Sequence, residues 1–230
     1  MTYFSALNKY KNNDYIKYME EYASNHKVPI LKEEGLDLLV SIIKMNNVKN
    51  ILEIGTAIGY SSSVFALINK DIRIDTIERD ELMYQEALKN INALGLESQI
   101  NIIFEDALNV DLSTLKLDQY DLIFIDAAKS QYIKFFEKFK YNLDENGVIV
   151  TDNLEFHGLV KDSSNCSRNT KQLVNKIKKY VEFLKTFNIT DEELEKIIVT
   201  EFDKPKEHIS AEKYLNHVIN SQQINKKQRR

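Results

Sequence analysis

From residue 50 onward, short apolar runs alternate with segments of helical periodicity. The apolar runs are nearly continuous, which is typical of strands that are buried on both faces of a parallel sheet. The expected strands are Asn50–Gly55, Ile72–Glu78, Ile100–Phe104, Tyr120–Asp126, Gly147–Asp152 and Ile197–Phe202, and the expected helices are Ser61–Asn69, Glu81–Leu94, Gln131–Leu143 and Thr170–Phe187. This alternation predicts a doubly wound, mostly parallel α/β sheet, which binds ligands at the carboxyl ends of its strands.

The first 48 residues have a different pattern and are expected to be helical. Tyr15, Tyr18, Met19 and Tyr22 recur at helical spacing, and a second apolar face follows between Leu36 and Ile43. Pro29 separates the two segments because proline lacks an amide donor and restricts the residue before it. We therefore expect a helical extension at 1–48, packed on the same domain, the main domain at 49–213 and a polar tail at 214–230.

Composition narrows the class of protein. The 230 residues carry a net charge of −4, so the molecule as a whole lacks the basic field expected of a DNA-binding protein. Cys166 is the single cysteine and cannot form an internal disulfide, which fits a reducing compartment. No apolar run approaches the roughly 18 residues of a membrane span, and the polar start has no apolar signal core. We expect a soluble, cytoplasmic protein without a membrane partner.

The end of the first strand carries a candidate ligand-binding turn. Gly55 and Gly59 let the chain turn tightly and pass close to a ligand, and the next helix begins near Ser61 with its amide groups directed at that place. The third glycine of the dinucleotide fingerprint is missing. This glycine pair alone is weak support for any particular ligand.

Acidic residues follow the neighbouring strands. Glu78 ends the second strand and can accept both hydroxyls of a ribose, whereas Asp106, followed by Ala107, can accept from an adenine amino group. The alternative for Glu78 and Asp106 is that each is a solvated acid at a strand end. Glu53 and Asp126 lie near the glycine turn, where their charges suit the amino and sulfonium groups of S-adenosylmethionine better than the phosphates of NAD.

Three oxygen-bearing side chains follow the fourth and fifth strands. Asp126, Asp152 and Asn153 would meet on the ligand edge of the sheet, and hard oxygen donors without histidine or thiolate favour Mg²⁺ or Mn²⁺. Aspartates are also common as caps after strands. The occurrence of both on adjacent strand ends favours a metal site with open positions for substrate oxygens.

Taken in order, the segments ILEIGTAIGYS, TIER, EDA, FIDAAKSQY and VTDN resemble the cation-dependent O-methyltransferases, which include catechol and caffeoyl-CoA methyltransferases. EYASNHKVPI and FHGLV make the bacterial tRNA 5-hydroxyuridine methyltransferases the closer resemblance. The likeness covers roughly residues 15–200. The chain departs from the family pattern at Asp203–Lys213, where the family has a glycine-containing turn and a last strand.

The resemblance implies a seven-stranded methyltransferase sheet, a homodimer and specific residue roles. It implies Asp126, Asp152 and Asn153 as metal ligands, and Lys129 as the active-site lysine beside Asp126. The implied cofactor contacts are Leu31, Gly55, Ser61, Glu78, Asp106, Ala107 and Asp126. The N-terminal helices are the candidate dimer interface, and the face formed by Tyr15, Tyr18 and Tyr22 fits a contact surface, although packing within the chain explains that face equally well.

The substrate remains open between classes. A metal-bound hydroxyl would lose its proton and attack the methyl group, with Lys129 either taking that proton or staying charged beside the oxyanion. The basic stretch 161–187 could hold tRNA phosphates, which favours methylation of 5-hydroxyuridine at the wobble position to 5-methoxyuridine; such stretches are also common as solvated helix faces. The alternatives are a small-molecule catechol or caffeoyl-CoA type of O-methyltransferase, and a non-catalytic S-adenosylmethionine-binding module.

Overall fold

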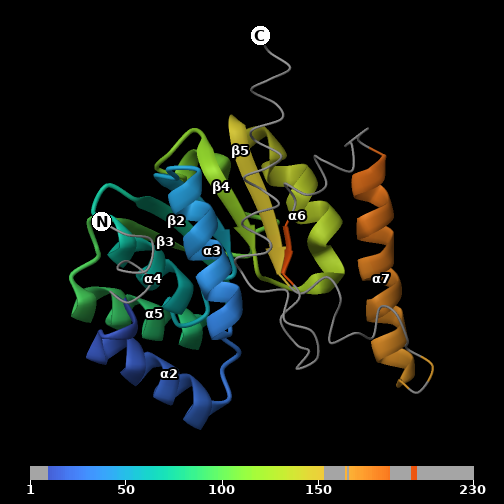
Figure 1. Ribbon diagram of the computed structural model, residues 1–230. Coiled ribbons are helices and arrows are strands. Elements are labelled where there is room, and N and C mark those ends of the chain that lie inside the picture. Colours follow the sequence, from blue (N-terminus) through green and yellow to red (C-terminus); the bar gives the residue numbers. More distant parts are fainter. Residues whose placement is uncertain (1–9, 153–163, 165, 187–197, 201–230) are drawn as a thin grey trace.

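The computed structural model of the chain describes residues 10–152, 164, 166–186 and 198–200 (Figure 1). The helices are α2 (Asp14–His26), α3 (Glu33–Met45), α4 (Tyr60–Ile68), α5 (Glu81–Leu94), α6 (Tyr132–Phe139) and α7 (Arg168–Lys185). The strands are β1 (Asn50–Ile54), β2 (Arg73–Glu78), β3 (Ile100–Phe104), β4 (Tyr120–Ile125), β5 (Leu143–Asp152) and β6 (Ile198–Thr200). The predicted alternation of strands and helices is therefore confirmed.

The strands form one sheet in the order β3-β2-β1-β4-β5-β6, and every pairing is parallel. The order reverses direction beside β1, which makes the sheet doubly wound as expected. The described residues supply six strands rather than the seven of the family pattern. Asp203–Lys213, where the sequence departs from that pattern, and the polar tail lie outside the described residues.

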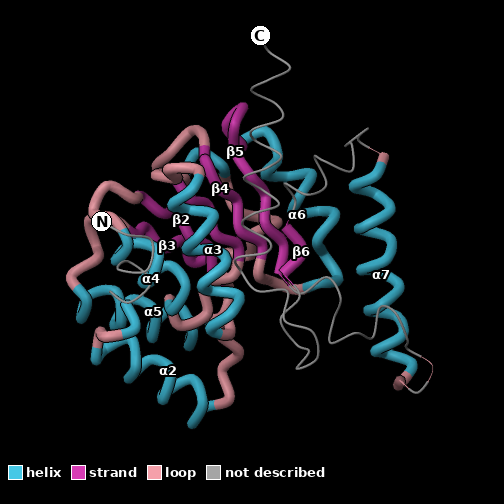
Figure 2. Tube along the Cα trace, in the orientation of Figure 1, coloured by secondary structure: helices cyan, strands magenta, loops and turns pink. Residues whose placement is uncertain are grey.

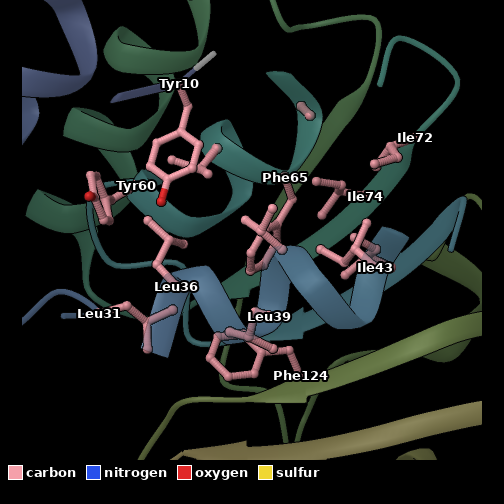
Figure 3. Close-up of a cluster of buried hydrophobic side chains, with 14 of the residues drawn as sticks. Tyr10, Leu31, Leu36, Leu39, Ile43, Tyr60, Phe65, Ile72, Ile74 and Phe124 are labelled. Atoms are coloured by element: carbon pink, nitrogen blue, oxygen red, sulfur yellow. The ribbon is translucent and has the colours of Figure 1, made fainter. Parts of the chain in front are cut away.

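Helices cover the two faces of the sheet because consecutive strand residues point to opposite sides. Ile51 and Phe124 belong to a cluster with residues of α2, α3 and α4, whereas Leu52 and Ile123 belong to a second cluster with residues of α6 and α7. Figure 3 shows the first cluster, in which Leu36 of α3 points toward Tyr10 and Leu39 lies beside Phe124. The strands read as continuous apolar runs because both faces are buried.

The N-terminal helices share the first of these cores. Ile16 and Met19 of α2 and Leu36 and Leu39 of α3 are almost fully buried in it. Asn13 caps α2 by accepting from the amides of Tyr15 and Ile16, and α2 ends before the segment that contains Pro29, where the sequence predicted a break. In Figure 2, α3 lies over the sheet and α2 lies at the bottom of the view, below α5.

One boundary differs clearly from the sequence prediction. The helix expected over 131–143 ends at Phe139 and is followed by a single turn of 3₁₀ helix, and β5 then begins at Leu143 rather than at Gly147. A register irregularity between Tyr120 and Leu122 lets β5 extend backward along β4. Asp144-Glu145-Asn146 has the composition of a turn, so the sequence alone gave no indication of a strand there.

Of the helices in the described part of the chain, none is long and apolar enough to cross a bilayer. Cys166 is free and partly buried.

Candidate functional site

The carboxyl ends of five neighbouring strands bring the predicted residues to one edge of the sheet. Main-chain hydrogen bonds join these ends in series, from Glu105 to Glu78, from Gly55 to Ile77 and from Asp126 to Ile54, at 2.9 to 3.0 Å. Along this edge the acids follow the strand order. Asp106 comes after β3, Glu78 ends β2, Asp126 comes after β4 and Asp152 ends β5.

Gly55 allows the chain to pass directly against the end of β4. Its φ is +103°, and a Cβ placed on it would lie 2.1 Å from the main-chain oxygen of Asp126. Gly59 also has a positive φ of 76° and begins α4. The two glycines predicted to shape the turn are thus both required by its geometry.

Glu53 lies beneath this turn and is fully buried. Its carboxylate accepts hydrogen bonds from the hydroxyls of Ser61 (2.5 Å), Ser62 and Thr76 (2.6 Å). Burial raises the pKa of Glu53, and the three hydroxyl donors act in the opposite direction. Glu53 therefore fastens the first turn of α4 to the ends of β1 and β2, and it holds Ser61, one of the residues predicted to contact the cofactor.

Glu78 and Asp106 face the turn from the next two strands. Glu78 accepts from the amides of Ala57, Arg79 and Asp80, each at 2.8 Å, so it ties the glycine turn to β2. Asp106 accepts from the amide of Leu108 and lies 3.3 Å from the Arg79 guanidinium; these contacts, led by the amide, hold its pKa below the ordinary value. Asp106 is then a carboxylate at neutral pH, as recognition of an amino donor requires.

Asn90 of α5 connects α2 to the same turn. It is buried, its amide nitrogen donates to the carbonyl of Ile58 at 2.9 Å, and its amide oxygen accepts from the Tyr15 hydroxyl at 3.1 Å. Tyr60, at the start of α4, donates to Glu20 of α2 at 2.6 Å. These contacts support the turn from the side of α2, and sequence analysis did not single out Asn90.

Lys138 of α6 holds the loop that follows Asp106. Its ammonium group donates to the carbonyls of Leu108 and Val110 at 2.8 and 2.7 Å. Ala107, in the same loop, is buried. Lys138 was also missed by sequence analysis, because a lysine at the end of an amphipathic helix carries no local signal of such a role.

Asp126 and Asp152 place two carboxylates at the ends of the central strands. Asp126 is partly buried, and its pKa is raised first by burial and then by the negative charge of Asp152. Lys129 opposes this shift, and its ammonium lies 3.8 Å from the Asp152 carboxylate. The negative charge of Glu53 raises the pKa of Asp126 further. The region is thus electronegative and favours a positively charged ligand.

Tyr132 begins α6 beneath these groups and is almost fully buried, with 1% of its surface exposed. Its hydroxyl donates to the main-chain carbonyl of Asp152 at 2.9 Å and accepts from Lys129 at 3.4 Å. Burial, followed by the charges of Asp126 and Asp152, raises its pKa, so the hydroxyl stays protonated. Tyr132 lies in the FIDAAKSQY segment, where the sequence alone suggested no role for it, although its spacing of one helical turn from Lys129 was a usable signal.

Leu31 and Asn153 are the remaining residues that the sequence predicted for the site. Leu31 lies between α2 and α3 with 9% of its surface exposed, in the same hydrophobic cluster as Tyr60. Asn153, the third predicted metal ligand, lies outside the described residues. Within the residues that the structure describes, no group of three or more histidine, cysteine, aspartate or glutamate side chains is placed to hold a metal ion. Asp126 and Asp152, the other two predicted ligands, follow or end adjacent strands, and their role in holding a metal stays a prediction.

This parallel sheet, with its glycine turn and strand-end acids, is the fold of the S-adenosylmethionine-dependent methyltransferases. The chain belongs to the O-methyltransferase family, whose sequence model matches residues 8–204. It is 45% identical to a Staphylococcus aureus protein of known structure, described as a "putative caffeoyl-CoA O-methyltransferase", with a TM-score of 0.72 over 79% of this chain and 87% of that one. An O-methyltransferase from Bacillus cereus, solved with SAH, is 24% identical with a TM-score of 0.65, over 76% of this chain and 80% of that one, and supports the fold alone.

Plant methyltransferases are among the curated relatives that match the chain. Tapetum-specific methyltransferase 1 of Arabidopsis thaliana is 32% identical over 164 residues, which are 70% of this chain and 66% of the relative. A caffeoyl-CoA O-methyltransferase of Populus kitakamiensis is 32% identical over 145 residues, 61% of each chain. The chain thus spans less than two thirds of the length of these relatives. The names of these relatives do not refer to tRNA, so the closer resemblance to tRNA 5-hydroxyuridine methyltransferases stays a prediction.

Proposed function

We propose that the protein transfers the methyl group of S-adenosylmethionine to a hydroxyl oxygen of its substrate, with Mg²⁺ or Mn²⁺ as a required cation. The placement of Asp126 and Asp152 at adjacent strand ends is the observation that carries the proposal. The negative charge of Asp152 disfavours ionisation of Asp126, and a divalent cation held by these carboxylates would remove that cost. Asn153 would add a third oxygen donor.

Support for S-adenosylmethionine comes from the strand-end acids and from related structures. Glu78 and Asp106 suit a ribose and an adenine, and the electronegative region around Asp126 suits the amino and sulfonium charges. Among the structural neighbours, an O-methyltransferase of Streptomyces achromogenes was solved in complex with SAM. The cofactor would then extend along the sheet edge from Asp106 toward Asp126.

Substituting Lys138 by methionine is expected to weaken S-adenosylmethionine binding about tenfold, because two charge-assisted hydrogen bonds that hold the Asp106 loop are lost. Isothermal titration calorimetry measures the change. Lys134→Met is the matched control, since Lys134 is exposed on the same helix. Equal affinity in the two variants would show that the Lys138 contacts do not order the cofactor loop.

Side chains of the protein would orient the acceptor hydroxyl for the reaction. When bound, the cation lowers the pKa of a coordinated hydroxyl, so that an oxyanion forms near neutral pH. Lys129 lies beside Asp152, where its ammonium can steady that oxyanion or its amine can accept the proton. Rate enhancement beyond this rests on positioning the oxygen in line with the methyl group.

The names of the relatives favour a small-molecule acceptor of the catechol or caffeoyl-CoA type. Such a molecule has a hydroxyl next to a second oxygen, and the two together can occupy the open positions of one cation. Both the plant relative from Populus kitakamiensis and the Staphylococcus aureus protein carry the caffeoyl-CoA description. We place this class of substrate first.

The exposed face of α7 favours a second candidate, 5-hydroxyuridine at the wobble position of tRNA, which would become 5-methoxyuridine. This base also places a hydroxyl beside a carbonyl oxygen. α7 is amphipathic, with Val174, Ile177 and Tyr180 buried, and Glu182 is its single acid. Its exposed basic residues are Arg168, Lys171, Lys176, Lys178 and Lys179. A run of this kind can follow phosphates.

Methyl transfer to a catechol, caffeoyl-CoA and 5-hydroxyuridine-containing tRNA is expected to stop in EDTA and to return with Mg²⁺ or Mn²⁺. Mass spectrometry of the products identifies the acceptor. If tRNA is the acceptor and all five basic residues of α7 reach phosphates, binding should weaken roughly 100-fold between 50 and 200 mM salt. Transfer that is unaffected by EDTA would refute the cation requirement. Cofactor binding without transfer to any acceptor would indicate a non-catalytic binding module.

A further inference from the structure

The hydroxyl of Tyr132 contacts groups on both sides of the proposed reaction site. It donates to the main-chain oxygen of Asp152, at the end of β5, and accepts from the ammonium of Lys129, one helical turn earlier. A phenol has one proton to donate, so the donation to Asp152 leaves an oxygen lone pair for Lys129. One buried oxygen thus contacts both a strand end and the side chain of Lys129.

The ring of Tyr132 has little freedom to move. Its centroid lies 5.4 Å from that of Tyr180 in α7, and Tyr180 packs edge-on against Phe136 of α6. The Tyr180 hydroxyl pairs with the Thr151 hydroxyl at 3.0 Å, one residue before Asp152. The two tyrosines are equally buried and adjacent, but only Tyr132 contacts both Lys129 and Asp152 among the contacts of the described residues.

Long side chains lose considerable rotamer freedom when they are held in one place. Lys129 has 18% of its side chain exposed, and its ion pair with Asp152 is long, at 3.8 Å. Such a pair alone fixes the ammonium loosely, whereas the added contact with a buried hydroxyl defines its position. The Asp152 main chain is held in the same way, because its carbonyl accepts from a rigid donor.

We infer that Tyr132 is a positioning residue whose hydroxyl aligns the Asp152 strand end and the Lys129 ammonium for the reaction. The inference rests on the proposed function, since it assigns Asp152 to the cation and Lys129 to the acceptor oxygen. Tyr132 acts through these two groups and does not itself contact the substrate. Partners that orient ligand residues commonly contribute 10- to 100-fold in metal affinity or activity, so about tenfold is the expected scale.

The test compares Tyr132→Phe with Tyr180→Phe. Each variant removes one hydroxyl from a buried tyrosine and keeps the ring, so both should fold, and thermal unfolding checks that they are destabilised alike. Mn²⁺ affinity, measured by electron paramagnetic resonance without substrate, is expected to fall about tenfold in Tyr132→Phe and to change less than about twofold in Tyr180→Phe. Equal affinities in the two variants would overturn the inference for Asp152.

Turnover provides the second measurement. Tyr132→Phe is expected to lower kcat about tenfold with an unchanged KM for S-adenosylmethionine, and to have a smaller effect in a Lys129→Met background because the two residues act together. Equal effects in both backgrounds would overturn the inference for Lys129. If the unsubstituted protein binds no Mn²⁺, the proposed function itself fails, a result distinct from equal affinities in the two tyrosine variants.

Discussion

Asp126→Asn is expected to lower methyl transfer about 100-fold or more, because it removes a charge that both the cation and the cofactor are proposed to require. The substitution keeps the size of the side chain, and the main-chain bond from residue 126 to Ile54 is unaffected. It also removes the repulsion between Asp126 and Asp152, so the folded protein should not be less stable. Mn²⁺ affinity, S-adenosylmethionine affinity and kcat together measure the effect.

Asp121→Asn is the matched control for this prediction. Asp121 lies near the start of the same strand, where its carboxylate accepts from the amides of Lys49 and Asn50. The same chemical change is made there at the opposite end of β4, far from the proposed cation. Asp121→Asn should keep both cation affinity and turnover. Retention of Mn²⁺ binding by Asp126→Asn would remove Asp126 from the cation site.

Gly55→Ala is expected to lower turnover about 100-fold, since a displacement of about 1 Å at a reaction site can have that effect. The added Cβ would lie 2.1 Å from the Asp126 oxygen and 2.8 Å from its carbonyl carbon, and both are main-chain atoms that cannot rotate away. The turn and the end of β4 must therefore separate. S-adenosylmethionine affinity is expected to fall with turnover, and calorimetry and steady-state kinetics measure the two effects.

Gly95→Ala is the control for Gly55→Ala, because it tests the effect of a positive φ without a Cβ clash. Gly95 ends α5 with φ +67°, and a Cβ placed there meets nothing within 4 Å. The variant should lose roughly 1–2 kcal/mol of stability through the left-handed conformation alone, while its turnover stays unchanged. If Gly55→Ala behaves like Gly95→Ala, with a lower melting temperature and normal kinetics, close approach at Gly55 has no functional role.

Much of the fold could be predicted because its physical causes are local or topological. β3 and α5 have the predicted bounds, since continuous apolar runs and helical periodicity mark them directly. The assembly of Glu78, Gly55, Asp126 and Asp152 along one edge could also be predicted, because parallel strands align their carboxyl ends. Residues far apart in the sequence were thereby placed together without any knowledge of side-chain contacts.

What the sequence did not reveal depends on contacts between side chains of different elements. The three hydroxyls around Glu53 come from α4 and β2, and the carbonyl that Tyr132 binds comes from β5. Such partners are determined by packing distances, and no periodicity reports them. The early start of β5 has a similar origin, because pairing with β4 overrides the turn-like composition of residues 144–146.

The strand order separates the proposed donor-binding residues from the proposed acceptor-binding residues along one edge of the sheet. The residues expected to bind the methyl donor follow β3, β2 and β1, whereas the residues expected to orient the acceptor follow β4 and β5. Gly55 and Asp126 form the boundary between them. Substitutions beyond β5 can therefore change which acceptor is methylated while the binding of the methyl donor stays the same.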